Sequence, residues 1–236
     1  MMAFLGIQSL FHSQLAALID GPQIADAESV DDVIFGEKKA LAAAGKDNFE
    51  ALSSYEAHQL VRAFLYRKFD SLSSSSFFKT ISDPTIPNEP FRVMTFFFAG
   101  LASFHLAREA KEEEKKWMKI GDTLLEKMEC WNKFISWNFQ SKMLLLKAEK
   151  MYCLGETESA ASLYEQSIKS AHDHKFIHEE GIAHELCGHF HLEMGHRLEA
   201  LESFNSSVQC YINWGALAVA RRLEVFVKST FCSESL

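Results

Sequence analysis

The sequence predicts an all-α protein in which antiparallel helix pairs stack into a superhelix, an α-solenoid of about nine to eleven helices. Three observations predict it: few helix-breaking residues, helical spacing of apolar residues from residue 91 onward, and a pattern that occurs twice, forty residues apart. The 236 residues include only 11 Gly and 4 Pro, and three of the prolines lie together at Pro84, Pro87 and Pro90. Long segments are therefore free to form uninterrupted helices.

The repeated pattern places small and aromatic residues where two packed helices need them. The first copy consists of Ala148, Leu154-Gly155, Ala160, Tyr164 and Ser167, and the second of Gly188, Met194-Gly195, Ala200, Phe204 and Ser207. Helices that pack at about 8 to 10 Å leave little room for side chains at the contact point. We therefore expect Ala148 to face Ala160 and Gly188 to face Ala200. The rings of Tyr164 and Phe204 would fill the gap to the neighbouring pair, so the repeat predicts stacked helical hairpins.

The first ninety residues are less regular than the rest. Residues 2–19 and 49–69 have helical patterns, and Gly21-Pro22 and an acidic stretch separate them. Four consecutive serines and three prolines within residues 71–90 predict a short imperfect helix followed by a loop. We treat residues 1–236 as one helical-repeat domain, with residues 1–90 as a degenerate N-terminal part and residues 91–236 as the regular array.

The regular array begins with two helices of different character. Residues 91–108 contain the run Phe96-Phe97-Phe98, which is too apolar all round for a surface, so this helix is expected to be central. Residues 111–132 carry an apolar stripe at spacings of three and four, typical of a helix that buries one face. The stripe consists of Trp117, Ile120, Leu124, Met128 and Trp131.

Four further helices and a closing helix follow. They are predicted over residues 136–154, 157–174, 177–194 and 197–213, with Gly155 and Gly195 in the turns that end two of them. Residues 216–230 place Arg221 and Arg222 on the side opposite an apolar stripe formed by Ala216, Ala220, Leu223 and Val227. A solenoid needs a terminal element with a polar outer face, and we expect this helix to provide it.

Composition excludes several classes of protein. A hydrophobic content of 47% in 236 residues allows a large core without disulfides or metals, and the twenty Phe are expected to fill it. The net charge of −8 and pI near 5.7 argue against a nucleic-acid partner. We expect no membrane association either, because no apolar run reaches the eighteen or so residues of a membrane span.

Cysteine usage and the N-terminus indicate a cytoplasmic protein. The five cysteines are odd in number and widely spaced, with no C-x-x-C pair, which favours a reducing compartment. The apolar stretch of residues 4–19 is interrupted by Gln8, His12, Ser13 and Gln14, and no Lys or Arg precedes Lys38. These features are not typical of a secretory signal peptide.

The repeated pattern resembles the tetratricopeptide repeat, with a few extra residues after the second helix, as in His172-Asp173-His174-Lys175-Phe176. The whole chain resembles more specifically the tetratricopeptide-like tail of the predicted AAA-type ATPase module of multidomain signalling proteins. Those proteins also contain a serine/threonine kinase domain and a sensor histidine kinase with GAF or PAS domains. The strongest resemblance is carried by Phe176-Ile177-His178-Glu179-Glu180, Ala183, Glu185-Leu186, Phe190, Gly195, Tyr211 and Trp214-Gly215-Ala216.

A weaker resemblance covers residues 136–171 and, loosely, residues 65–69, where Arg67 replaces the turn glycine. The resemblance implies a regulatory or docking segment, whose partner is another protein or the neighbouring signalling domains. The family's nucleotide-binding and phosphotransfer domains lie outside the matched part. A further interpretation is therefore that the chain retains the tail of a larger regulator.

Histidines suggest an alternative of a different class. The segment His184-Glu185-Leu186-Cys187-Gly188-His189 resembles a zinc-protease motif, but its histidines are five residues apart, about 140° around a helix, and cannot share a metal. His184, Cys187 and His191 do share one helical face, so the alternative is a metal-binding protein or a small metal-dependent enzyme. No phosphate-binding loop or nucleophile elbow is present. We therefore expect a non-enzymatic scaffold, with no catalytic residue, cofactor or metal.

Overall fold

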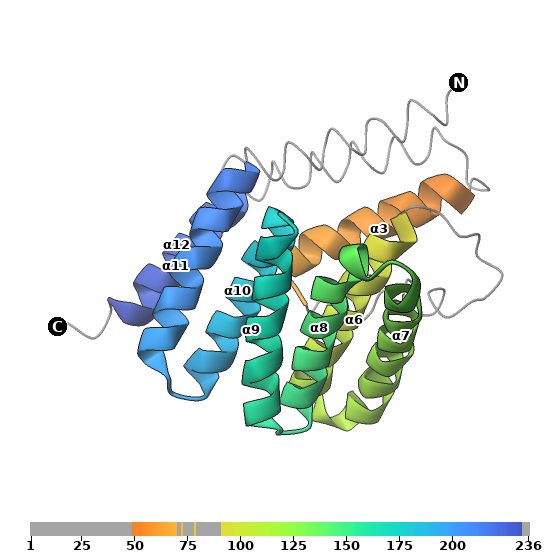
Figure 1. Cartoon of the computed structure of the whole chain (residues 1–236), viewed down its shortest axis with the longest axis horizontal. Helices are drawn as coiled ribbons and strands as arrows, with labels where there is room; N and C mark the ends of the chain where they lie inside the picture. The colour runs from red at the N-terminus through yellow and green to blue at the C-terminus, as the bar shows by residue number, and fades with distance from the viewer. Residues whose placement is uncertain (1–48, 70–71, 73–77, 79–90, 233–236) are drawn as a thin grey trace.

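The computed structural model describes residues 49–69, 72, 78 and 91–232, and within them every regular element is a helix (Figure 1). The elements are α3 (Phe49–Leu65), α6 (Phe91–Glu109), the short 3-10 helix η1 (Lys111–Glu113), α7 (Glu114–Phe134), α8 (Ser136–Cys153), α9 (Thr157–Asp173), α10 (Ile177–Glu193), α11 (Arg197–Trp214) and α12 (Leu217–Phe231). The predicted helix at 2–19 and most of the predicted loop region at 71–90 lie outside the described residues. The predicted total number of helices therefore includes a part of the chain that is not described.

The helices form an α-solenoid, as predicted. Consecutive helices α6 and α7, α8 and α9, and α10 and α11 form the three closest pairs, and Figure 1 shows them running up and down in turn. The first helix of each pair packs against the first helix of the next, α6 on α8 and α8 on α10. We call α6, α8, α10 and α12 the inner layer. Helix α3 packs against this layer through α6.

Helix α6 is central, as its sequence predicts. Phe96, Phe97 and Phe98 have exposed fractions of 3% or less, and the α7 side chains Trp117 and Met128 are equally buried. Phe64 of α3 meets Phe98 edge to face, with ring centroids 5.2 Å apart. The predicted bounds of the helices from α6 onward are confirmed to within a few residues, whereas the predicted helix at 49–69 ends earlier, at Leu65.

The turns that end the helices adopt a left-handed backbone conformation. Gly155, Gly195 and Gly215 have φ values of 77°, 81° and 88°. Arg67 and Lys175 adopt the same conformation, with φ values of 54° and 63°, although it is strained for residues with a Cβ.

Arg67 therefore occupies the position of the turn glycine at the end of α3. The backbone N–H of Lys68 donates to the carbonyl of Ala63 and that of Arg67 to the carbonyl of Phe64. The same two bonds recur around Gly155, from Glu156 to Met151 and from Gly155 to Tyr152. Both sets follow the Schellman pattern, so the Arg67 substitution preserves the turn.

The left-handed turns give a first prediction. Lys175→Gly should raise the free energy of unfolding by about 0.5 to 1 kcal/mol, because it relieves backbone strain at an exposed residue. Gly155→Ala should lower it by about 1 kcal/mol, since a Cβ there meets no atom within 4 Å and adds strain alone. Urea unfolding of both variants tests this, and changes of the same sign would contradict it.

Hydroxyl groups confirm the forty-residue repeat in three dimensions. The Ser167 hydroxyl donates to the carbonyl of Ser141 at 2.8 Å, and the Ser207 hydroxyl donates to the carbonyl of Gly181 at the same distance. Both bonds join the second helix of a pair to the first. The two copies therefore pack in the same register.

Contacts around the small residues add one detail to the repeat. A Cβ on Gly188 would first meet the ring of Phe204, at 2.7 Å. Phe204 also contacts Phe226 of α12, with centroids 5.5 Å apart, and Tyr164 contacts Phe190 of α10 at 5.3 Å. These aromatic rings fill the gap to the next element, as predicted. Phe204 fills the space over Gly188 as well, because glycine leaves room for a ring.

Candidate interaction surface

The inner layer carries a cluster of charged side chains on α6, α8, α10 and α12. The Arg108 guanidinium of α6 lies 2.8 Å from the Glu149 carboxylate of α8, and the Tyr164 hydroxyl of α9 donates to the same carboxylate. Arg108 also lies over the Tyr152 ring, 4.3 Å from its centroid. Burial alone would lower the pKa of Arg108, but Glu149 more than offsets this and raises it. This ion pair joins the helix pair α6 and α7 to the helix pair α8 and α9.

A second ion pair joins α10 to α12. The Arg222 guanidinium donates to both carboxylate oxygens of Glu185, at 2.7 and 2.8 Å, and the Tyr211 hydroxyl donates to the carboxylate at 2.8 Å. Burial alone would raise the pKa of Glu185, but Arg222, together with nearby His189 and Arg67, holds it well below its ordinary value. Glu185 is therefore ionised, and its role is to hold α12 against α10.

This geometry corrects the expectation for the closing helix. The side chain of Arg222 was expected on the polar outer face with Arg221, but it is only 20% exposed and reaches inward to Glu185. Arg221 is exposed, as expected, and the predicted apolar residues Ala216, Ala220 and Leu223 are buried. The apolar stripe of α12 indicated only that Arg222 lies on the opposite side of the helix. In the structure, Glu185 of α10 is within reach on that side.

Arg67 brings a fifth charge to the cluster. Its electrostatic neighbours are both carboxylates, Glu149 and Glu185, and both arginines, Arg108 and Arg222, while burial lowers its pKa. The guanidinium lies 5.1 Å from the centroid of the Phe69 ring. The turn after α3 therefore places Arg67 among charges from all four helices of the inner layer, α6, α8, α10 and α12.

His105 lies beside this cluster and makes it sensitive to acid. Its ring lies 3.8 Å from that of Phe69, centroid to centroid. Burial, together with the nearby charges of Arg67 and Arg108 and with His189, lowers the pKa of His105 to about 3. In the folded protein the ring is therefore neutral over the range in which an unfolded histidine, with a pKa of about 6.5, takes up a proton.

The His105 shift predicts a pH dependence of stability. Because the unfolded chain binds a proton on His105 that the folded chain does not, the free energy of unfolding should fall as the pH drops from about 6.5 toward 3. His105→Phe should make this dependence shallower. Urea unfolding between pH 7.5 and 5 tests it, with the exposed His196→Phe as the control. An unchanged slope for His105→Phe would contradict the prediction.

A third buried pair joins α8 to α10. The Lys142 ammonium forms an ion pair with Glu179, and the Ser141 hydroxyl donates to the same carboxylate. Lys142 and Glu179 have exposed fractions of 8% and 3%. The carboxylate is satisfied from two sides, as a buried charge requires.

The structure does not form the metal site of the alternative interpretation. Among the described residues, no group of three or more His, Cys, Asp or Glu side chains is placed to hold a metal ion, and His184, Cys187 and His191 are no exception. Cys187 is buried, and burial raises the pKa of its thiol to about 11. Glu185, the glutamate of the zinc-protease resemblance, is engaged by Arg222 and Tyr211.

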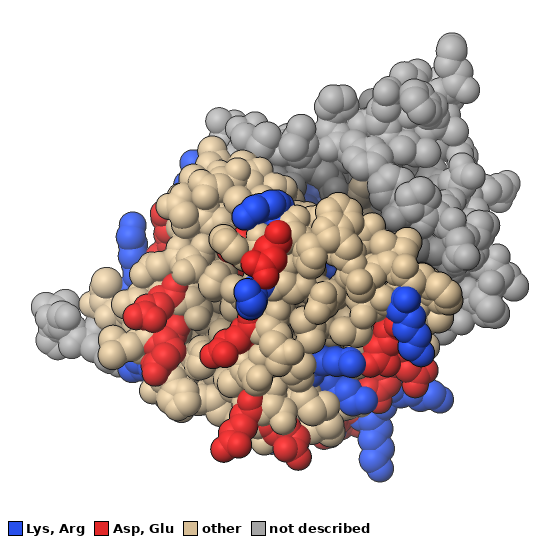
Figure 2. All heavy atoms as spheres, in the orientation of Figure 1, with Lys and Arg blue, Asp and Glu red and all other residues tan. Residues whose placement is uncertain are grey.

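Charges on the surface are mixed in sign. Figure 2 shows acidic and basic side chains interspersed on the face in view, with broad uncharged areas between them. No helix in the described part of the chain is both long and apolar enough to cross a bilayer.

Stacked helix pairs with a forty-residue register are the architecture of tetratricopeptide-type repeats. A comparison with protein-family models matches residues 75–227 to the family described as CHK1-like, TPR repeats. The chain belongs to this family. No curated protein and no solved structure matches it. Membership of the CHK1-like TPR-repeat family supports a helical scaffold for protein interaction and confirms the tetratricopeptide-like part of the resemblance.

Sequence reasoning named no interaction residue, and it missed the buried pairs. Glu149 and Glu185 lie within predicted helices, and their neighbours in the sequence, Lys147, Lys150 and His184 among them, do not mark them as buried. Buried carboxylates need partners, but the partners of Glu185 lie 26 and 37 residues away in the sequence. Spacing within one helix cannot identify such partners.

Proposed function

We propose that the chain is a non-enzymatic scaffold that docks a protein partner or neighbouring domains, and that it serves as a regulatory segment in cytoplasmic signalling by kinases or ATPases. The observation that carries this proposal is the stack of hairpins matched to the CHK1-like TPR repeats over residues 75–227. Repeat arrays of this type present an extended surface that can bind a partner.

The inner layer supports a rigid scaffold. Buried pairs of opposite charge join α6 to α8, α8 to α10, and α10 to α12. Removing one member of such a pair is costly, so each pair restrains the relative position of two helices. A surface whose helices are held in this way is organised before binding, which lowers the entropic cost of docking.

Affinity capture of the full chain with chemical cross-linking and mass spectrometry tests the proposal. We expect cross-links to a kinase-bearing or ATPase-bearing protein, at positions within residues 91–232. A matched capture with Phe204→Ala, which removes a buried side chain of the array, should lose them. Cross-links exclusively to proteins without such domains would contradict the signalling role, and turnover of a substrate by the purified chain would contradict the scaffold role.

A further inference from the structure

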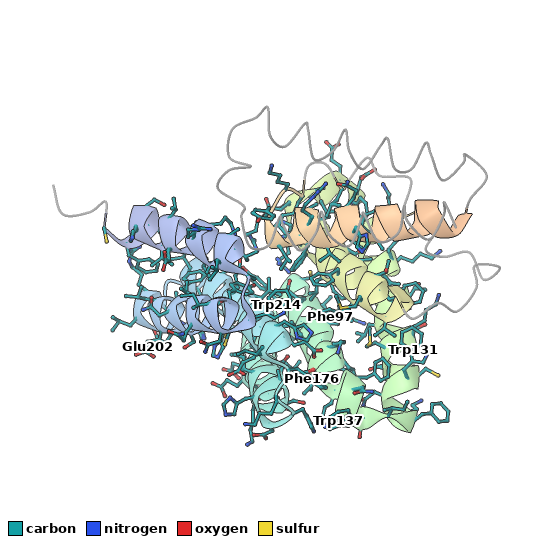
Figure 3. The ribbon with its side chains drawn as sticks, turned by 90° about the horizontal axis from the view of Figure 1, so that it is seen from above. Phe97, Trp131, Trp137, Phe176, Glu202 and Trp214 are labelled. Atoms are coloured by element: carbon teal, nitrogen blue, oxygen red, sulfur yellow. The ribbon has the colours of Figure 1, made fainter. Side chains whose placement is uncertain are left out.

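Three turns at one end of the array carry aromatic residues at corresponding positions. Phe134, His174 and Trp214 lie forty residues apart, at the turns between α7 and α8, α9 and α10, and α11 and α12. Trp214 is also the last of four rings that form a continuous series, which we call the aromatic row: Trp137, Phe176, His178 and Trp214. Their successive centroid distances are 5.4, 6.5 and 5.6 Å. Figure 3, viewed from above, shows Trp137, Phe176 and Trp214 following one another across these turns.

One end of the aromatic row is unusually exposed. Phe134, Ile135 and Trp137 have exposed fractions of 80%, 52% and 56%, and they lie within four residues of the chain. Leu217, three residues after Trp214 in the sequence, is 41% exposed. A contiguous exposed apolar area of this kind marks an interaction site in soluble proteins, whereas single exposed residues do not.

Phe176 and His178, in the centre of the aromatic row, contact the buried ion pair of Lys142 and Glu179. The Lys142 ammonium, paired with Glu179, lies 5.3 Å from the centroid of the Phe176 ring. The His178 ring nitrogen lies 3.6 Å from the same carboxylate. Phe176 and His178 are therefore held in place by buried charges, so the row is organised before any partner arrives.

The charges around the row are unequal. Two neighbouring carboxylates are paired with lysines, Asp173 with Lys169 at 3.2 Å and Glu179 with Lys142, and Glu180 lies 2.9 Å from a ring nitrogen of His172. Lys133 and Lys175 flank the row, are exposed, and form no ion pair with a described residue. Among the described residues, these two lysines outnumber Glu180, the one carboxylate named here without a lysine partner, so the net charge of the group is positive although the chain as a whole carries −8.

We propose that the aromatic row and its flanking lysines bind an extended segment of a partner protein in which aromatic or aliphatic residues are flanked by Asp or Glu. Trp137 and the neighbouring Phe134 and Ile135 supply the exposed apolar contact, and Lys133 and Lys175 select the acidic flanks. The inference rests on the proposed scaffold function and assigns it a surface and a partner chemistry. It places the site on the turns between the helix pairs, next to Tyr211, whose hydroxyl donates to Glu185 of the charged cluster.

Selection of random peptides displayed on phage, against the full-length chain, tests the inference. We expect enrichment of peptides that combine Phe, Trp, Leu or Ile with Asp or Glu. Trp137→Ser should weaken their binding about tenfold or more, as loss of a central aromatic contact does. Leu198→Ser, which removes a 76% exposed apolar residue from the start of α11, should leave it unchanged.

Reversing the charge of the two lysines is the second part of the peptide-binding experiment. Lys133→Glu with Lys175→Glu should weaken the selected acidic peptides and enrich basic ones in a new selection. Lys115→Glu with Lys228→Glu changes the net charge equally at exposed sites elsewhere and should do neither. Circular dichroism confirms that each variant is folded before binding is measured.

Three results would overturn the inference. Failure to enrich apolar-acidic peptides, or binding that Trp137→Ser leaves unchanged, would remove the assigned surface or chemistry. Concentration-dependent self-association that Trp137→Ser abolishes would identify a second copy of the chain as the occupant instead. None of these results affects the cross-links to kinase-bearing or ATPase-bearing proteins, by which the proposed function is judged separately.

Discussion

Replacement of Glu185 by alanine is expected to lower the free energy of unfolding by about 3 to 5 kcal/mol, because removing one member of a buried ion pair leaves the other charge uncompensated. Glu185 receives two hydrogen bonds from Arg222 and one from the Tyr211 hydroxyl. Its side chain is 6% exposed and that of Arg222 is 20% exposed. The variant leaves Arg222 without its counter-ion and Tyr211 without its acceptor. Urea unfolding at neutral pH measures the loss.

Two controls separate this effect from general loss of a carboxylate. Glu202→Ala removes an exposed glutamate of α11 at the outer edge of the array and should change stability by less than about 0.5 kcal/mol (Figure 3). Glu185→Met with Arg222→Met replaces both charges by apolar groups and should recover part of the loss. A loss below about 1 kcal/mol for Glu185→Ala would show that the pair does not hold α12 against α10.

Replacement of Phe204 by alanine should cost about 3 to 5 kcal/mol of stability, as for a fully buried aromatic ring. Phe204 is 0% exposed, fills the space over Gly188, and contacts Phe226 of α12. Its loss creates a cavity between the last hairpin and the closing helix. Thermal or urea unfolding measures the change.

Phe134→Ala is the matched control, since it removes the same side chain from a site that is 80% exposed. Its effect on stability should stay within about 0.5 kcal/mol. Equal effects of the two substitutions would mean that Phe204 does not pack between the hairpin and α12. The aromatic contact assigned to the second copy of the forty-residue repeat would then be wrong.

Much of the fold could be predicted because its signals are local. Apolar stripes such as Trp117, Leu124 and Met128 define a buried helical face within one element. Gly155 and Gly195 mark turns because their backbone conformation favours glycine at the turn itself. The helix bounds from residue 91 onward follow from such signals.

The contacts between helices could be predicted less well, because they depend on residues far apart in sequence. The stripe of α12 shows which residues face α11, but not that α10 lies on the other side to receive Arg222. Likewise, small residues at 188 and 200 indicate close packing, but only the structure shows that the Phe204 ring fills the space over Gly188. Arg67 shows that a left-handed turn can form without its glycine when the hydrogen-bond pattern is kept.

The candidate site was partly visible in the sequence. The spacing of forty residues, extended into the turns, relates Phe134, His174 and Trp214. The exposure of Phe134 could not be predicted from the sequence, nor could the finding that Lys133 and Lys175 form no ion pair with a described residue.

The bond from the Ser167 hydroxyl to the Ser141 carbonyl recurs forty residues later, from the Ser207 hydroxyl to the Gly181 carbonyl. Forty residues are therefore the unit of length by which the protein can be extended. Tandem duplication of one forty-residue segment would add a helix pair. Its serine hydroxyl, its turn glycine and its aromatic ring would occupy the same positions as in the neighbouring pairs. An insertion of another length within the helices would shift these positions out of alignment.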